Sequence, residues 1–118
     1  MIMIRREFLG IAAALAFPAW LHAQVKLRVA VTDRHGRHIR GLKPGDFRVL
    51  EDGIAQKISA FEDGESNQDQ EHAYTITYHS DPSNRNEGFR KIIIEIVSDK
   101  AKNYRVRTRP GYRTNEFQ

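Results

Sequence analysis

An all-β fold is what the sequence predicts: a single immunoglobulin-like antiparallel β-sandwich of six to seven strands. Apolar and polar residues alternate with a period of two along several short segments after residue 24, and turn-forming residues separate those segments. No stretch of that region has a convincing helical period. The 118 residues have the size of one domain and include no cysteine, so the core must hold the fold without disulfides or thiolate-bound metal.

Residues 1–23 have the organisation of a helical signal peptide. Arg5 and Arg6 supply a basic start, Leu9–Phe17 form a short apolar run, and Leu21-His22-Ala23 offers a cleavage site. Because the run is too short to span a bilayer comfortably, we expect no permanent transmembrane segment. The prediction is a periplasmic or secreted protein whose mature part is residues 24–118.

The export route is indicated by the string Arg5-Arg6-Glu7-Phe8-Leu9-Gly10, which resembles the twin-arginine motif. The resemblance implies that Arg5 and Arg6 contact the twin-arginine export machinery and that the domain crosses the membrane already folded. A general secretory signal that carries two arginines by chance is the alternative.

The mature chain opens with a clear strand pattern. From Val25 to Thr32, apolar residues alternate with mostly polar ones, as in a half-buried strand. Asp33–Gly36 and Lys43–Asp46 have turn composition, and residues 39–42 between them are expected to be a short strand or an extended connection.

A hairpin and a polar loop come next. Phe47–Leu50 and Ile54–Phe61 flank Asp52-Gly53, a dipeptide favoured in tight hairpins. Glu62–Glu71 contains no large apolar residue, so we expect an exposed loop over residues 62–73.

Three further strands are predicted in the second half. Tyr74–Tyr78 and Tyr104–Arg109 alternate with a period of two, whereas Phe89–Val97 contains an apolar run flanked by charges. That run favours a central strand. Ser80–Gly88 is polar and rich in turn formers, and we expect no strand there.

Two groups of residues carry a family resemblance. The opening group is Val29-Ala30-Val31-Thr32-Asp33, Gly36, Gly41-Leu42, Asp46-Phe47-Arg48-Val49, Glu51-Asp52-Gly53, Gln56-Lys57-Ile58 and Phe61. The closing group is Tyr74–Tyr78, Gly88-Phe89-Arg90-Lys91-Ile92 and Val106-Arg107-Thr108-Arg109-Pro110-Gly111-Tyr112. In this order they resemble the segments that flank the A domain in bacterial, acidobacterial-type von Willebrand factor A-related proteins. The two matches cover most of residues 25–113.

The chain departs from that family between the two groups. Members carry an entire A domain there, whereas this chain has only the polar loop Glu62–Glu71. The resemblance implies that the flanking segments form one sandwich into which the A domain is normally inserted, since exposed loops with close ends tolerate insertions. Residues 25–61 and 74–113 should then share one core.

The cation site of the A domain is not expected here. That site is built on Asp-x-Ser-x-Ser, and the nearest string is Asp81-Pro82-Ser83-Asn84-Arg85. Arg85 stands where a divalent cation needs an oxygen ligand, so we expect a plain turn and no metal.

No catalytic site is predicted either. Glu51 and Asp52 lie at a hairpin tip, where we expect well-hydrated turn formers rather than an acid–base pair. The sequence has no nucleophile elbow, phosphate loop or dinucleotide fingerprint, so we expect neither an enzyme nor a cofactor. We expect His35, His38, His72 and His79 to be exposed loop residues rather than zinc ligands.

One constellation predicts binding. Arg105, Arg107 and Arg109 point to one side of their predicted strand, and Lys26 and Arg28 share a side of the first strand. If the two strands are neighbours, they form a basic face suited to anionic polymers, phospholipid headgroups or an acidic protein. Aromatic contacts would be added by Tyr78, Tyr104 and Tyr112. A solvated outer face that discourages edge-to-edge aggregation is the alternative.

These observations leave two function classes. The first is an exported, non-catalytic module for protein interaction or a structural role at the cell envelope, with an envelope protein as partner. The second is a binding module for an anionic glycan or envelope polymer through the basic face. The net charge of +4 does not require a nucleic acid partner, and an exported protein is not expected to meet one. A remnant gene that has lost its A domain is a third reading.

Overall fold

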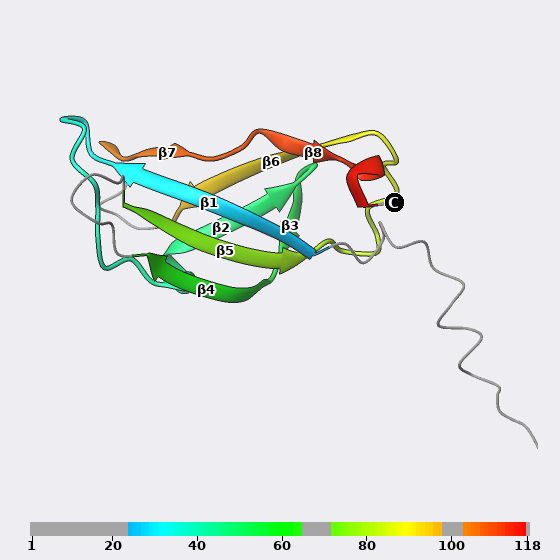
Figure 1. The fold of residues 1–118 in the computed structure, drawn as a ribbon, viewed down its shortest axis with the longest axis horizontal. Helices are drawn as coiled ribbons and strands as arrows, with labels where there is room; N and C mark the ends of the chain where they lie inside the picture. The colour runs from blue at the N-terminus through cyan, green and yellow to red at the C-terminus, as the bar shows by residue number, and fades with distance from the viewer. Residues whose placement is uncertain (1–23, 65–71, 98–102, 118) are drawn as a thin grey trace, which may run out of the picture.

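The computed structural model describes residues 24–64, 72–97 and 103–117 as a two-layered β-sandwich (Figure 1). The sheets have the orders β4-β5-β1-β7 and β3-β2-β6-β8, and their strand pairs are antiparallel. The predicted all-β sandwich is therefore confirmed, while the predicted signal peptide lies outside the described residues. The strands are β1 (Gln24–Thr32), β2 (Phe47–Glu51), β3 (Ile54–Gln56), β4 (Ile58–Gly64), β5 (Ala73–His79), β6 (Phe89–Ile96), β7 (Arg105–Arg107) and β8 (Gly111–Arg113).

The described residues also include two short 3-10 helices, Pro44–Asp46 and Thr114–Phe117. Within the described ranges, no helix is long and apolar enough to cross a membrane.

The described residues form eight strands instead of the predicted six to seven, because one expected strand divides and β8 lies beyond the last expected one. The segment 54–61 breaks at Lys57, where the chain leaves the second sheet and enters the first, so β3 pairs with β2 and β4 pairs with β5. The last expected strand shortens to β7, and the chain then passes back to the second sheet as β8, beside β6.

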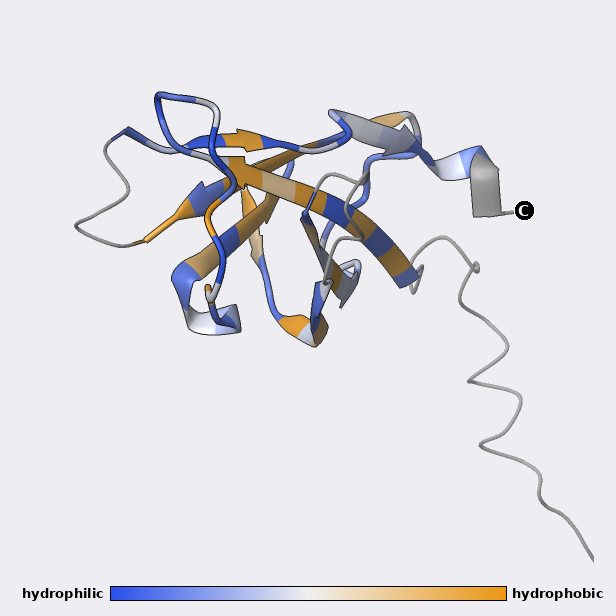
Figure 2. Cartoon of the chain, turned by 60° about the vertical axis from the view of Figure 1, so that its left-hand side comes forward, coloured by the Kyte–Doolittle hydropathy of each residue, from blue (hydrophilic) through white to orange (hydrophobic). Residues whose placement is uncertain are grey.

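The core forms between the inner faces of the two sheets. Along β1 the odd-numbered residues from Val25 to Val31 are buried, and Lys26 and Arg28 between them are exposed. Figure 2 shows this alternation as orange and blue bands on the strands. The phenol of Tyr74 donates to the carbonyl of Ile39 (2.7 Å) and accepts from the amide of Leu42 (3.1 Å), so it fixes residues 39–42 as a connection over the core.

The two halves of the chain share this core. β1 lies between β5 and β7, and β2 pairs with β6, so neither half could bury its apolar face alone. Gly64 pairs with Ala73, which brings the ends of segment 65–71 side by side. β4 extends three residues into the expected loop, and His72 is buried at its other end, so the expected loop boundaries 62–73 were too wide.

Candidate functional site

A buried ion pair lies at one end of the sandwich. Glu51 ends β2 and Arg90 is the second residue of β6, and both side chains are fully buried. Their strands explain this, because Glu51 continues the inward series of Phe47 and Val49, and Arg90 shares the inward side with Ile92. The expectation of a hydrated turn-forming Glu51 is therefore wrong.

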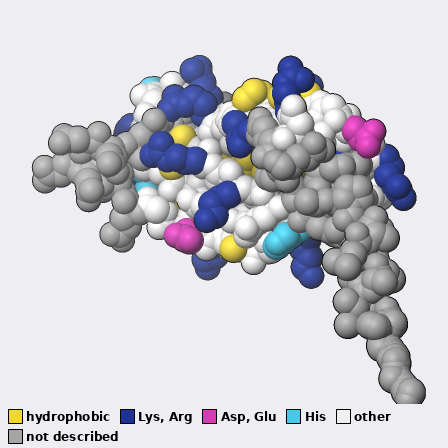
Figure 3. Space-filling model, turned by 45° about the vertical axis from the view of Figure 1, so that its right-hand side comes forward, with side chains coloured by type: hydrophobic (Ala, Val, Ile, Leu, Met, Phe, Trp, Pro, Cys, Tyr) yellow, Lys and Arg dark blue, Asp and Glu magenta, His cyan; other side chains and the backbone are white. Residues whose placement is uncertain are grey.

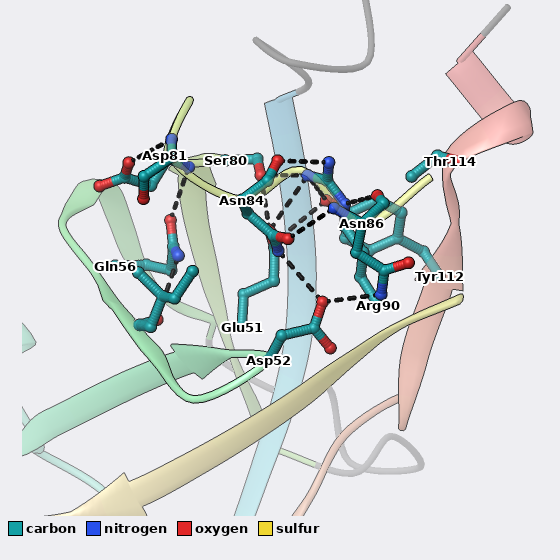
Figure 4. Close-up of polar contacts among 12 residues, drawn as sticks. Glu51, Asp52, Gln56, Ser80, Asp81, Asn84, Asn86, Arg90, Tyr112 and Thr114 are labelled. Carbon is teal, nitrogen blue, oxygen red and sulfur yellow. Dashed lines mark hydrogen bonds and ion pairs between the residues drawn. The ribbon is translucent and has the colours of Figure 1, made fainter. Parts of the chain in front are cut away.

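The Glu51 carboxylate is surrounded by donors (Figure 4). Arg90 Nη1 donates to Glu51 Oε1 at 3.2 Å, and Ser80 Oγ and Asn84 Nδ2 donate to the same oxygen at 2.6 and 2.8 Å. Glu51 Oε2 accepts from the phenols of Tyr78 and Tyr112, each at 2.7 Å. We call these six residues the polar cluster: Glu51, Tyr78, Ser80, Asn84, Arg90 and Tyr112.

Arg90 also fixes the loop between β5 and β6. Its Nε donates to the carbonyl of Asn86 (2.8 Å), and its Nη2 donates to the carbonyl of Asn84 (2.9 Å). Nη1 donates further to Ser80 Oγ (2.6 Å) and to the Tyr112 hydroxyl (3.3 Å). One guanidinium thus joins β2, β6, β8 and the polar loop.

The two tyrosines act as permanent donors. Burial and the hydrogen bond to Glu51 raise the pKa of Tyr78, and burial also raises the pKa of Tyr112, so both phenols keep their protons. Both side chains lie in the core, so the expected aromatic contribution of Tyr78 and Tyr112 to a surface is wrong, whereas Tyr104 is half-buried. The charged members have no exposed surface, so the hydrogen bonds of the polar cluster join strands and loop inside the fold.

Asp52 follows the cluster and does form the predicted turn. Its φ of 51° and the φ of 83° at Gly53 are left-handed, as a two-residue hairpin requires. Its carboxylate accepts from Asn84, Asn86 and the amide of Lys91. Burial alone would raise the pKa of Asp52, but these hydrogen bonds outweigh it and hold that pKa below its usual value.

The remaining polar candidates have local roles. Asp81 Oδ1 accepts from the amide of Ser83 (2.8 Å), and the Asp81 carbonyl accepts from the amide of Asn84 (3.0 Å), which makes the expected turn. His72 is buried, against expectation, and its Nε2 lies 2.6 Å from Asp63 Oδ1, whereas His79 is exposed. Among the described residues, no group of His, Asp and Glu side chains has the geometry to hold a metal ion.

The residues of the predicted basic face are brought together. β7 pairs with β1, with Arg107 opposite Ala30 and Arg105 opposite Thr32, so their side chains share the outer face of the first sheet with Lys26 and Arg28. All five basic residues are exposed, Arg109 included. This sheet is the front layer in Figure 1, and Figure 3 shows Lys and Arg side chains spread over the surface with few acidic ones among them.

Two adjoining hollows lie on this face, and we call them together the basic groove. The first, of about 240 Å³, is lined by Arg28, Ala30, Ala73, Arg107, Thr108 and Arg109. The second, of about 430 Å³, shares Ala30 and Arg107 with it and is also lined by Thr32, Gly36, His38, Arg105 and Val106. The small side chains of Ala30 and Ala73 leave room between longer basic ones.

Sequence reasoning found the basic residues but not what lies between them. The signal for the groove was present as Ala30, the one small residue among the outward positions of β1 that otherwise carry Lys26 and Arg28. Thr108 was missed as well. Its Oγ1 is buried and has no hydrogen-bond partner among the described residues, although it lines the first hollow.

Comparison with protein-family models, with curated proteins and with solved structures finds no match to this chain.

Proposed function

We propose that the protein is an exported, non-catalytic module that binds an anionic glycan of the cell envelope through the basic groove. The observation that carries the proposal is the pairing of β7 with β1, which gathers basic residues from two distant segments on one sheet face. A predominantly basic face attracts an anionic polymer from a distance and holds it at several points.

The extent of the groove, over two adjoining hollows, favours a polymer over a single ion. Arg105 and Arg107 are two residues apart on one strand, so their side chains start about 7 Å apart along it. Arg28 and Arg107 also have interactions within the chain, but a guanidinium has five N–H donors and can serve more than one acceptor.

The uncharged lining favours a glycan over a purely ionic chain. Thr32 lines the second hollow and lies opposite Arg105, so its hydroxyl stands among the arginines. A hydroxyl can both donate and accept hydrogen bonds. Sugar hydroxyls do both, and uronate groups supply the anions.

Replacing two arginines of the groove is expected to weaken this binding. Arg105→Gln/Arg107→Gln should lower the affinity for polygalacturonate by about tenfold or more, because each guanidinium gives charge-assisted hydrogen bonds. Isothermal titration calorimetry measures the affinity, and titration with neutral dextran serves as the uncharged control. Lys43→Gln/Lys57→Gln, which removes two exposed charges outside the groove, should bind like the wild type.

The same titration separates the possible ligands. Binding to polygalacturonate that weakens steeply with added salt supports the proposal. Equal loss in both double variants would show non-specific attraction and contradict it. Binding to polyglutamate but not to polygalacturonate would replace the glycan with an acidic protein.

Export is tested separately, since residues 1–23 lie outside the described residues. We expect a C-terminally tagged chain to accumulate in the periplasm or medium as a product that begins at Gln24. Arg5→Lys/Arg6→Lys should abolish this product if the twin-arginine route is used. Fractionation and N-terminal sequencing measure it, and a full-length cytoplasmic product in the wild type would refute export.

The family resemblance enters as a further part of the proposal. A sandwich shared by both halves, with Gly64 and Ala73 paired at the ends of segment 65–71, is what a host of an inserted domain requires. This supports a flanking domain of the von Willebrand factor A-related kind in which a short segment stands in place of the inserted A domain. Failure to obtain a folded, exported product would instead favour the remnant gene.

Protein interaction at the envelope is the second candidate function. It is favoured by the large apolar side chains of Phe89, Ile93 and Val97, which are exposed on the second sheet.

A further inference from the structure

The outer face of β6, together with Val97 directly after it, carries an apolar stripe interrupted by two opposite charges. Phe89, Ile93 and Val97 are 45%, 41% and 51% exposed, and Lys91 and Glu95 lie between them. We call these five residues the outer stripe. They lie on the opposite side of the sandwich from the basic groove, since β6 belongs to the second sheet.

The middle of the outer stripe widens into an apolar row. Ile93 is in register with Leu50 of β2, and Leu50 is in register with Ala55 of β3. Directly paired residues of neighbouring strands have side chains on the same face, so this row crosses three strands. Beside it, Arg48 Nε lies 3.7 Å from Glu95 Oε1, with both side chains about half exposed.

The order of residues in the outer stripe is self-complementary. On either side of Ile93 stand Lys91 and Glu95, and beyond them Phe89 and Val97. A two-fold axis through Ile93, parallel to the sheet and perpendicular to β6, places Lys91 against Glu95 of a second copy. It also places Phe89 against Val97 of that copy, and Ile93 and Leu50 against themselves. Such a surface meets the requirement of an isologous interface.

We propose that the outer stripe is the interface of a homodimer in which two second sheets pack face to face. The apolar row would supply the buried area, and two Lys91–Glu95 pairs would fix the antiparallel register. The Arg48–Glu95 pair within each copy is exposed and weak, so Glu95 can accept a second cation. This inference does not rest on glycan binding. If both hold, the dimer presents two basic grooves on opposite sides and could join two polymer strands.

Charge exchange tests the register of this dimer. Sedimentation equilibrium of the wild-type protein, from about 1 μM to about 1 mM, should show monomer and dimer in a concentration-dependent balance. Lys91→Glu places acidic groups against Glu95 of the second copy and should weaken association at least about tenfold. Lys91→Glu/Glu95→Lys restores opposite charges and should recover the wild-type constant to within about threefold.

Controls keep the outcome clear. Lys57→Glu makes the same charge change at an exposed position outside the outer stripe and should leave association unchanged. Thermal unfolding of each variant separates loss of association from loss of fold, because Glu95→Lys also removes the pair with Arg48. A wild type that stays monomeric throughout would overturn the proposal, as would a double variant no better than Lys91→Glu alone.

Discussion

Arg90→Met is expected to lower the free energy of unfolding by about 3–5 kcal/mol, the typical cost of breaking a buried ion pair from one side. The substitution leaves the Glu51 carboxylate buried with no cation beside it and removes the donors that hold the carbonyls of Asn84 and Asn86. Domains of this size are stable by only about 5–15 kcal/mol, so the variant should stand close to unfolding.

Urea denaturation followed by far-ultraviolet circular dichroism measures this loss. Tryptophan fluorescence would be uninformative about the sandwich, since the single tryptophan, Trp20, precedes it. Arg85→Met is the matched control, because Arg85 is an exposed arginine in the loop between β5 and β6 that Arg90 holds. It should change the stability by less than about 0.5 kcal/mol.

A second variant distinguishes the ion pair from simple packing. Glu51→Gln/Arg90→Met removes both charges and keeps an amide where Tyr78 and Tyr112 can still donate to an oxygen. Its loss of unfolding free energy should be smaller than the summed losses of Glu51→Gln and Arg90→Met, because neither buried charge is left without its partner. Strict additivity would mean that the pair contributes nothing beyond its separate hydrogen bonds.

The strand pattern of the sandwich was largely readable from the sequence. The alternation of apolar and polar residues predicts β1, and Asp52-Gly53 predicts the turn between β2 and β3. Both signals are local, so they can be recognised without knowing the tertiary contacts. The division at Lys57 was not readable, because the choice between pairing with β2 and pairing with β5 is made by tertiary contacts. No residue between Ile54 and Phe61 marks that change of sheet.

The polar cluster was missed although its signal was present. Glu51 has the same parity as Phe47 and Val49, and Arg90 has the same parity as Ile92 and Ile94, so both charges stand at inward positions. Two opposite charges at inward positions of two strands indicate a buried pair. The run Ile92–Ile94 hid the parity of β6, and the turn after Glu51 suggested exposure.

For the basic groove, the sequence predicted the residues but not their adjacency. The side of each strand that carries the basic residues followed from alternation, but the adjacency of β1 and β7 depends on a topology that sequence alone left conditional. Once they pair, the register fixes Arg107 beside Ala30 and thereby opens the hollow.

Gly111→Ala is expected to be the other strongly damaging substitution, although it adds a single methyl group. A Cβ at residue 111 would collide with the carbonyl oxygen of Arg90 and would lie 2.6 Å from Cζ of Phe89. The carbonyl cannot withdraw without disturbing the pairing of β8 with β6, in which Gly111 stands opposite Lys91. We expect a loss of about 3 kcal/mol, at the upper end of the range for overpacking.

Urea denaturation with two companion variants identifies the contact responsible. Gly45→Ala meets nothing within 4 Å and should stay within about 0.5 kcal/mol of the wild type. Phe89→Ala/Gly111→Ala removes the ring but not the carbonyl, so it should recover little of the loss. Full recovery would contradict the backbone argument.

The losses of stability from Gly111→Ala and Arg90→Met should not be additive, because a displaced β8 also carries Tyr112 away from Glu51. Non-additive losses would show that β8 and the polar cluster are energetically coupled.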